Sequence, residues 1–376
     1  MNSIALNILL FLVGFACLTG GADFLVRGAS RLAVRLNVPL VVIGLTVVAF
    51  GTSLPELVVT LIANLQGGST AELAIGNVVG SNIANLALIL GVVALLRPLT
   101  VDRQLLVREY PLMIAVSLLF TWMAWDGRVT QLEGVLLFLG LLGFVYWSYA
   151  ASRSLAEEKE SEALEYIGGD AAIRQDQQFA QDGSPEAESP DEALATARAR
   201  IAEAEKRPLL PGALSGLFHS LLLRDIGMVA LGIIVLVLGA SWLVQSATFI
   251  ARYFGVSELI IGLSLVALGT SLPELAASVV AIIYRRGEIA MGNLVGSNLF
   301  NMLAIIGITA GVKALPAPLS MRGRDFPAML LIAILPLLLV LPVPHLMNRW
   351  KGALMLVLYL GYTIGIYLIS PPAGAG

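Results

Sequence analysis

The sequence predicts an all-α membrane protein in which ten transmembrane helices form two inverted repeats of five. Of its 376 residues, 57% are hydrophobic and 13% charged, and the mean hydropathy is +0.86, outside the usual range of soluble domains. Two motifs also occur twice. Gly44–Leu57 (GLTVVAFGTSLPEL) returns as Gly262–Leu275 (GLSLVALGTSLPEL), and Gly76–Asn85 (GNVVGSNIAN) returns as Gly292–Asn301 (GNLVGSNLFN). Each copy therefore carries one glutamate inside an apolar run.

Ten apolar segments are long enough to cross a bilayer. Five precede a charged insert and five follow it: 4–26, 38–65, 72–96, 107–125 and 131–152, then 225–251, 258–284, 288–312, 325–343 and 351–369. We therefore expect a first membrane repeat at 1–152, a linker at 153–224 and a second repeat at 225–376. Because the copies begin five spans apart, an odd number, the second crosses the membrane in the opposite sense. Such inverted repeats meet near the bilayer midplane, around the ion or substrate site.

The basic residues of the short loops predict an orientation with the N-terminus outside. The residues from Met1 to Phe24 lack the features of a cleaved signal peptide, so we interpret them as a retained first span. In this orientation ten basic residues are cytoplasmic and five are outside, as the positive-inside bias requires. The cytoplasmic ones are Arg27, Arg31, Arg35, Arg97, Arg103, Arg108, Arg285, Arg286, Arg349 and Lys351, and the outer ones are Arg128, Arg252, Lys313, Arg322 and Arg324.

The insert at 153–224 is acidic and is then cytoplasmic. Of the 26 acidic residues of the chain, 14 lie between Glu157 and Glu205, among Ser, Gln, Gly and Pro. Such a segment cannot bury enough apolar surface to fold alone, so we interpret it as a largely disordered linker, with a short helix from Asp191 to Lys206. The alternative is a calcium sensor, which the absence of a spaced Ca²⁺-loop pattern disfavours.

The composition excludes several classes of protein. Cys17 is alone and the two histidines, His219 and His345, are far apart, so neither a disulfide nor a metal cluster of soft ligands is expected. Nothing suggests a nucleic-acid partner, an obligate protein partner or a cofactor. An intramembrane protease would need a catalytic acid pair or a nucleophile with its base, and the repeated motifs contain no histidine. We therefore expect a protein that is not an enzyme.

The repeated Gly-Thr-Ser-Leu-Pro-Glu motif supplies oxygen ligands at a helix break. Pro55 cannot donate to the carbonyl of Gly51, so the helix bends or unwinds just before Glu56. Free carbonyls at bilayer depth are tolerated only where protein, water or an ion satisfies them. Thr52 and Ser53 add two hydroxyls within one turn of the carboxylate. The second copy has the same pattern, with Gly269, Thr270, Ser271, Pro273 and Glu274.

Hard oxygens without thiolate or imidazole suit Na⁺, Ca²⁺ or Mg²⁺. Mg²⁺ gives up its waters reluctantly, so a dehydrated cage fits Ca²⁺ or Na⁺ better. Two carboxylates, Glu56 and Glu274, would neutralise one Ca²⁺ or two Na⁺. The alternative is a pair of structural acids, but no Lys or Arg falls within either span to pair with them.

The second repeated motif adds further polar groups. Ser81 and Asn85, like Ser297 and Asn301, lie four residues apart and so share a helix face. For Asn77, Asn82, Asn293 and Asn298 we favour interhelical hydrogen bonds over ion contact. The glycines of this motif (Gly76, Gly80, Gly292 and Gly296) predict close helix packing. For Asp23 a salt bridge to Arg27, four residues on, is favoured over an ion ligand.

These paired motifs resemble the α-repeats of the calcium/cation antiporter superfamily, and the sequence is most similar to prokaryotic sodium/calcium exchangers. The resemblance implies that Glu56 and Glu274 bind Ca²⁺ and Na⁺ in alternation as transported ions, in a prokaryotic inner membrane. It implies hydroxyl ligands from Thr52, Ser53, Thr270 and Ser271. It also implies flanking Na⁺ positions at the carbonyls of Ala49 and Ala267 with Ser81 and Ser297, while Asn85 and Asn301 line the centre. Some relatives have Asp where this chain has Asn301, which weakens the case for K⁺ co-transport and for proton coupling.

The expected mechanism is alternating access, in which Na⁺ and Ca²⁺ compete for the same two carboxylates. The resemblance implies that spans one and six slide against the other eight. A proton/calcium antiporter is the main alternative, because a buried glutamate can be protonated. A cation channel is a further alternative, but two inverted copies in one chain fit alternating access better.

Overall fold

The computed structural model describes residues 4–36, 38–67, 69–148, 150, 212–254, 269–341 and 345–369. Contacts divide the chain into two compact units, residues 1–147 with 226–376, and residues 148–225. The first unit holds both repeated motifs. Most of the predicted linker, including the predicted helix from Asp191 to Lys206, lies outside the described residues, so the proposed division into domains stays a prediction.

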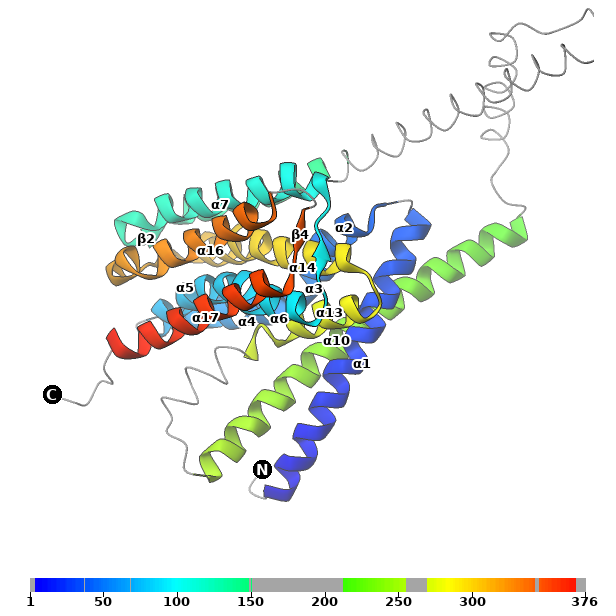
Figure 1. Cartoon of the computed structure of the whole chain (residues 1–376), viewed down its shortest axis with the longest axis horizontal. Coiled ribbons are helices and arrows are strands. Elements are labelled where there is room, and N and C mark those ends of the chain that lie inside the picture. Colours follow the sequence, from blue (N-terminus) through cyan, green and yellow to red (C-terminus); the bar gives the residue numbers. More distant parts are fainter. Residues whose placement is uncertain are drawn as a thin grey trace, which may run out of the picture. The chain divides into compact units, whose positions relative to one another are not determined.

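The first half is a run of helices, several of them interrupted (Figure 1). Its elements are α1 (Ile4–Leu36), α2 (Leu40–Ile43), η1 (Gly44–Val48), α3 (Ala49–Thr52), α4 (Leu54–Gln66), α5 (Ser69–Ile83), η2 (Ala84–Ile89), α6 (Leu90–Leu96), β1 (Leu99–Thr100), η3 (Leu105–Glu109), α7 (Tyr110–Met123), η4 (Ala124–Asp126), β2 (Arg128–Val129) and a helix at Gln131–Ser148. The segments η1, η2 and η3 are π-helical and η4 is a 3₁₀ turn.

The second half follows a similar order. Its elements are α10 (Gly212–Tyr253), α13 (Leu272–Ile283), α14 (Gly287–Phe300), the π-helical η6 (Asn301–Ile306), α15 (Gly307–Val312), β3 (Leu315–Pro316), the 3₁₀ segment η7 (Leu319–Gly323), α16 (Asp325–Val340), β4 (Leu346–Met347) and α17 (Arg349–Ile369). The residues from 255 to 268, which hold the start of the second copy of the first repeated motif (Gly262–Leu275), lie outside the described part.

The helices have the length and apolar composition of membrane-spanning segments. Among the described residues six helices are long and apolar enough to span one, or seven if the bent pair Leu40–Thr52 and Leu54–Gln66 is a single span. Large apolar side chains such as Leu132 and Trp122 are more than two-thirds exposed on the outside of the bundle, while Glu56, Glu274 and several asparagines lie inside. This polarity suits a lipid environment. The count of ten spans in two repeats stays a prediction.

Two helices extend beyond the predicted spans. The sequence predicts that the first span ends at residue 26, but α1 continues to Leu36, and α10 begins at Gly212 rather than at 225. Arg27 bonds to Asp23 at 2.9 Å, one turn earlier, which confirms the predicted salt bridge and favours continuation of the helix. A helix can leave the hydrocarbon layer without ending, so hydropathy marks the membrane boundary and not the helix boundary.

The predicted break before Glu56 is confirmed. The axes of Leu40–Thr52 and Leu54–Gln66 differ by 45°. Ser53 between them has φ −85° and ψ 3°, and Pro55 lies in the first turn of the new helix. Ser271 has nearly the same backbone, φ −89° and ψ 3°, just before α13. Proline is tolerated in a first turn because that amide has no intrahelical acceptor, so the motif starts a helix in both copies.

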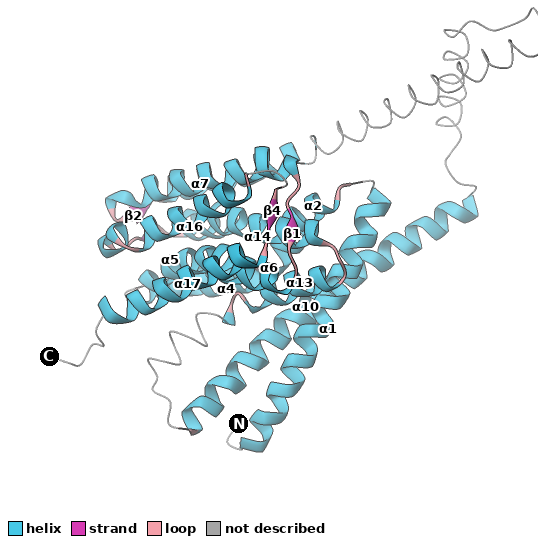
Figure 2. Ribbon diagram, in the orientation of Figure 1, coloured by secondary structure: helices cyan, strands magenta, loops and turns pink. Residues whose placement is uncertain are grey.

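Two short antiparallel ribbons join the halves. Leu99 and Thr100 pair with Met347 and Leu346, while Arg128 and Val129 pair with Pro316 and Leu315. Each ribbon takes one strand from each half of the chain. Figure 2 shows the two ribbons at opposite ends of the helices, so the halves are tied together at both ends.

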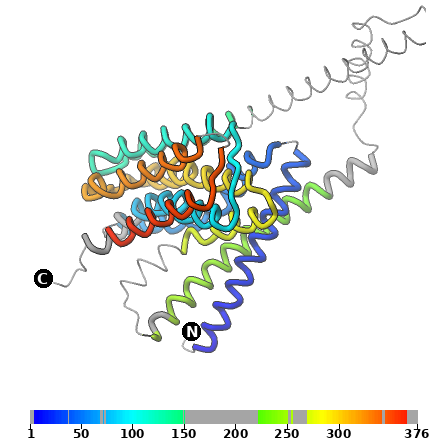
Figure 3. Tube along the Cα trace, in the orientation of Figure 1, coloured from blue at the N-terminus to red at the C-terminus, as the bar shows by residue number. Residues whose placement is uncertain are grey.

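Close glycine contacts hold α1 against α10. A Cβ at Gly14 would lie 2.9 Å from the Gly239 carbonyl oxygen, and one at Gly21 would lie 2.4 Å from the Leu236 nitrogen. Residue numbers rise along α1 as they fall along α10, so the pair is antiparallel. Figure 3 shows the two helices together, inclined to the rest of the first unit.

The predicted packing role of the second-motif glycines is confirmed for one copy. A Cβ at Gly292 or Gly296 would lie 2.4 Å from the carbonyl oxygens of Val41 and Leu45 respectively. No described atom lies within 4 Å of a Cβ at Gly76 or Gly80. The segment that would make the matching contact in the other copy falls within residues 255–268, outside the described part.

We expect Gly21→Ala to destabilise the protein by about 1 to 3 kcal/mol, because the new methyl meets backbone atoms of α10. Gly20→Ala is the matched control. No described atom lies within 4 Å of its Cβ, and alanine favours a helix, so its stability should be unchanged or slightly higher. Thermal unfolding of both variants in detergent tests this, and equal melting temperatures would contradict the packing argument.

Candidate functional site

The broken helices place both repeated glutamates inside the protein. Glu56 is in the first turn of α4 and Glu274 in the first turn of α13, and each is 1% exposed. A helix N-terminus favours a negative charge, so each break stabilises the carboxylate that follows it. The two acids therefore occupy matching positions in the two halves.

The two halves meet at these acids. The Ser53 hydroxyl of the first half donates to Oε1 of Glu274 in the second half, at 3.1 Å. The hydroxyls of Thr52 and Ser297 lie beside the same carboxyl, and the carboxyl groups of Glu56 and Glu274 are close enough to repel each other. Both acids thus belong to a single buried cluster.

Two asparagines connect the halves in matching ways. Asn77 donates to the Thr60 hydroxyl and Asn293 to the Ser278 hydroxyl, both at 3.1 Å and within one half. The Asn293 side-chain oxygen then accepts from Thr52 at 3.2 Å, and that of Asn77 accepts from Thr270 at 3.4 Å, across the halves. The predicted interhelical hydrogen bonds of these asparagines are confirmed.

Four more asparagines form a second matched set. Asn85 donates to Oδ1 of Asn298 at 3.0 Å, and Asn301 donates to Oδ1 of Asn82 at 2.9 Å. Asn85 and Asn301 lie in the π-helical segments η2 and η6. Such segments disturb regular helical bonding and are frequent at functional sites.

Several buried oxygens of this cluster have no hydrogen-bond partner among the described residues. They are Oε2 of Glu56, Oε2 of Glu274, Oδ1 of Asn85, Oδ1 of Asn301 and Oγ of Ser297. Buried polar groups are rarely left without a partner. All five belong to residues predicted as ligands, and a cation or its water would satisfy them together.

The other predicted site residues lie in the same interior. Ala49, Thr52, Ser53, Ser81 and Ser271 are buried, and Thr270 is half-buried. Ser271 donates to the Ser81 hydroxyl at 3.4 Å. Ala267 lies outside the described residues. The structure thus brings the described candidates together, and their role as ion ligands stays a prediction.

Asp23 has a different place. It bonds to Arg27, and the Tyr284 hydroxyl contacts both residues. This group joins α1 to the end of α13 and is exposed. It belongs to the helix interface and not to the buried cluster.

Two hydroxyl groups of the site, those of Thr60 and Ser278, were not predicted from the sequence. Thr60 and Ser278 are buried partners of Asn77 and Asn293, and each lies four residues after the glutamate of its own copy. A hydroxyl at the same offset in both copies could have revealed them.

A third repeated motif was also not predicted from the sequence. Arg108-Glu109-Tyr110-Pro111 returns as Arg324-Asp325-Phe326-Pro327, at the starts of α7 and α16. Asp325 is bonded to Arg324 at 3.0 Å and to Tyr362 at 2.8 Å, while Oε2 of buried Glu109 has no hydrogen-bond partner among the described residues. The acid is thus kept in both copies, but its partners differ.

A helical membrane fold with a buried, oxygen-lined centre is typical of membrane transporters of cations. The family described as sodium/calcium exchanger protein matches residues 6–150 and 225–368. The chain belongs to this family.

Relatives of similar length support the same conclusion. The putative antiporter CaxA of Alkalimonas amylolytica is 34% identical, over 93% of this chain and 95% of the relative. Sodium/calcium exchanger MaX1 of Methanosarcina acetivorans is 32% identical, over 97% of this chain and 100% of the relative. The solved structure of the sodium-calcium exchanger NCX_Mj matches with a TM-score of 0.72 at 25% identity, over 97% of this chain and 100% of that one.

We expect Asn85→Leu and Asn301→Leu to destabilise the protein by similar amounts, about 1 to 3 kcal/mol each, because each removes a matched buried hydrogen bond. Gln66→Leu, at an exposed position of α4, should leave stability unchanged. Thermal unfolding of the three variants checks this. A large loss for only one of the two asparagines would show that the matched bonds are not equivalent.

Proposed function

We propose that this protein exchanges Na⁺ for Ca²⁺ across the membrane by alternating access at the cluster around Glu56 and Glu274. One observation carries the proposal: the two halves bring their buried acids into one cluster whose unpartnered atoms are mainly oxygens of predicted ligands. An acid inside a membrane is costly, so such a pair is expected to bind a cation.

The ligand chemistry supports Ca²⁺ and Na⁺ as substrates. The cluster offers carboxylates, hydroxyls and amide oxygens, the ligands that these hard cations prefer. Two carboxylates balance the charge of one Ca²⁺ or of two Na⁺. The ions then compete for the same groups, and exchange follows if the empty cluster, with two uncompensated charges, cannot reorient.

The pairing of α1 with α10 supports alternating access by sliding. Gly14, Gly21, Gly232 and Gly239 bring the two backbones together without interlocking side chains. A pair joined in this way can move as one body past the site. Exposure of the cluster then switches from one side of the membrane to the other.

Names of relatives favour Na⁺ coupling without excluding protons. MaX1 and NCX_Mj are named sodium/calcium exchangers, whereas the name of CaxA states only a putative antiporter. The several hydroxyls beside the acids favour Na⁺, because a proton needs no such cage. A proton/calcium antiporter remains the second candidate function, since either glutamate could carry a proton.

The orientation is part of the proposal. We infer a prokaryotic inner membrane, an outer N-terminus and a cytoplasmic insert at 153–224, from the distribution of basic residues. Inner membrane protein YrbG of Escherichia coli is 32% identical over 96% of this chain and 97% of its own length, and its name agrees with that location.

An imposed Na⁺ gradient should drive Ca²⁺ uptake into vesicles that contain the protein. We expect Glu56→Gln and Glu274→Gln to reduce uptake to the level of protein-free vesicles, because each removes one of the two charges that neutralise Ca²⁺. The measurement is ⁴⁵Ca²⁺ uptake under a Na⁺ gradient, a pH gradient or neither.

Glu133→Gln is the matched control. Glu133 accepts hydrogen bonds from Thr130 at the start of the helix Gln131–Ser148, a role that glutamine can fill, so uptake should persist. Uptake driven only by pH would replace Na⁺ with protons in the mechanism. Rapid uptake without any gradient would indicate a channel.

Ca²⁺ should also stabilise the folded protein. A ligand at about 100 times its dissociation constant adds about 2.7 kcal/mol to the free energy of unfolding. We expect Ca²⁺ to raise the melting temperature of the parent and of Glu133→Gln, but not of Glu56→Gln. Added Na⁺ should reduce the Ca²⁺ shift if both ions use the same site, and a shift independent of Na⁺ would refute competition.

A further inference from the structure

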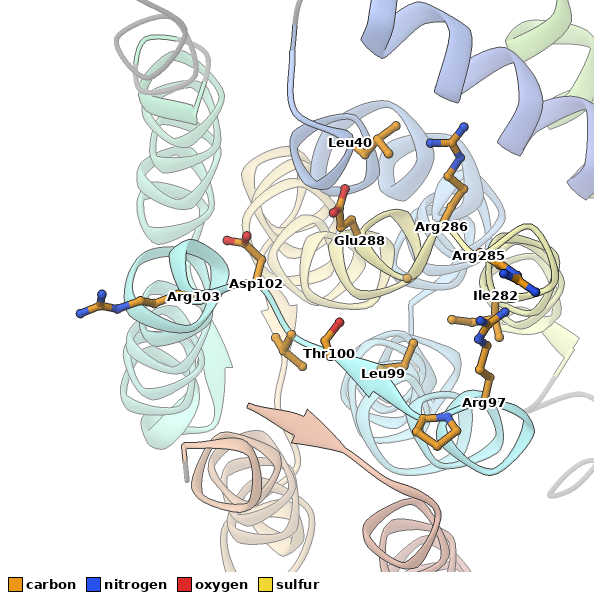
Figure 4. A pocket seen from close by; sticks show the side chains of 13 residues that line it. Leu40, Arg97, Leu99, Thr100, Asp102, Arg103, Ile282, Arg285, Arg286 and Glu288 are labelled. Atoms are coloured by element: carbon orange, nitrogen blue, oxygen red, sulfur yellow. The ribbon is translucent and has the colours of Figure 1, made fainter. Parts of the chain in front are cut away.

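A charged cavity of about 600 Å³ lies away from the ion cluster, where α6 and α13 end and α14 begins. Four arginines and two carboxylates are among its lining residues: Arg97, Arg103, Arg285, Arg286, Asp102 and Glu288. In Figure 4, Arg97 and Arg285 project to one side of the cavity, and Asp102 and Arg103 to the other, while Arg286 points toward Leu40. The cavity therefore has an excess of positive charge and an arginine-rich side.

Three arginines of the cavity do not stabilise the described fold through their side chains. Arg97, Arg285 and Arg286 are exposed, and none of their side chains forms a hydrogen bond or an ion pair with a described residue. Asp102, in contrast, is already engaged, since its carboxylate accepts from the backbone amides of Gln104 and Leu105. The positive-inside bias would be satisfied by arginine anywhere on this face, so the particular positions need another explanation.

The backbone at Arg285 favours glycine. Arg285 has φ +58°, in the left-handed region where a side chain costs free energy. Its amide bonds to the Ile282 carbonyl at 3.0 Å, and that of Arg286 bonds to Ala281 at 2.8 Å, the pattern of a helix end that usually carries glycine at this position. The matching residue of the first copy is Gly67, also at positive φ, +76°. The second copy thus keeps an arginine where the first uses the less costly residue.

Arg97 differs from its counterpart in the same way. Its counterpart is Lys313, and the two residues have nearly the same backbone angles, φ −152° and ψ 126° against φ −151° and ψ 127°. The Lys313 ammonium donates to the carbonyls of Asn64 and Leu65 at the end of α4. At the end of α13, the Ile282 carbonyl already accepts from the Arg285 amide. Arg97 is therefore left available to a ligand.

We propose that Arg97 and Arg285 bind a phosphate group, supplied either by the headgroup of an anionic phospholipid or by a soluble phosphate compound. Guanidinium groups bind phosphate oxygens in pairs of hydrogen bonds, and a cluster of them selects phosphate. Glu288, in the first turn of α14, also lines the cavity, but Figure 4 shows its carboxylate pointing away from Arg97 and Arg285. The cavity lies at the ends of membrane spans, where lipid headgroups are found.

Binding to the purified full-length protein tests this site without relying on exchange activity. In one arm, native mass spectrometry counts phosphatidylglycerol retained by the protein, with phosphatidylcholine as the neutral comparison. In the other arm, calorimetry measures inorganic phosphate binding at constant ionic strength. The variants are Arg285→Gly, which gives the backbone the residue it favours, and Arg349→Gln, an exposed arginine outside the cavity.

We expect Arg285→Gly to weaken binding about tenfold or more, the effect of one lost charge-assisted hydrogen bond, with a melting temperature at or above that of the parent. Arg349→Gln should bind as the parent does. Loss in the phosphatidylglycerol arm alone identifies a lipid site, and loss in the phosphate arm alone identifies a soluble ligand. The proposal is overturned if the parent binds neither probe, if Arg285→Gly binds normally, or if both variants lose binding equally.

Discussion

The cost of holding two carboxylates inside a membrane bundle governs the rest of this structure. Glu56 and Glu274 are almost fully buried, in a helical unit that exposes many large apolar side chains among its described residues. Each needs dipoles and oxygen-binding partners that a regular helix does not provide. The helix breaks at Ser53 and Ser271 meet that need, because they place a helix N-terminus and hydroxyls beside each acid.

The pairing of the two halves follows from the same constraint. Bonds cross between the halves around the acids: Ser53 bonds to Glu274, while Thr52 and Thr270 bond to Asn293 and Asn77. These asparagines are fixed in turn by hydroxyls of their own half. Since neither half alone satisfies its buried polar groups, the site exists only where the halves meet. The two strand ribbons, each with one strand from each half, hold that arrangement at both ends.

The sequence predicts which chemical groups lie at the buried centre, but it does not predict which of them contact each other. Pro55 sets a helix break through a local effect of its own ring, so the break and the acids could be predicted from the motif. The partners of Asn77 and Asn293 depend on how α4 packs on α5 and α13 on α14, which no single motif specifies. The extension of α1 to Leu36 was not predicted, because hydropathy marks where a segment leaves the membrane and not where its helix ends. The ribbons were missed because two-residue strands carry almost no pattern.

The two copies agree in the buried cluster around Glu56 and Glu274 and differ at the ends of their helices. Matched glutamates, asparagines and hydroxyls surround the centre, since one set of ions would meet both halves there. At the helix ends, Gly67 and Lys313 form an internally bonded end, whereas Arg285 and Arg97 leave charged side chains free. Packing alone would allow the same residue at the positions of Arg97 and Lys313, because the backbone angles of these two residues are nearly equal. The difference therefore points to a demand present on only one face, which is what a ligand restricted to one side of the membrane would impose.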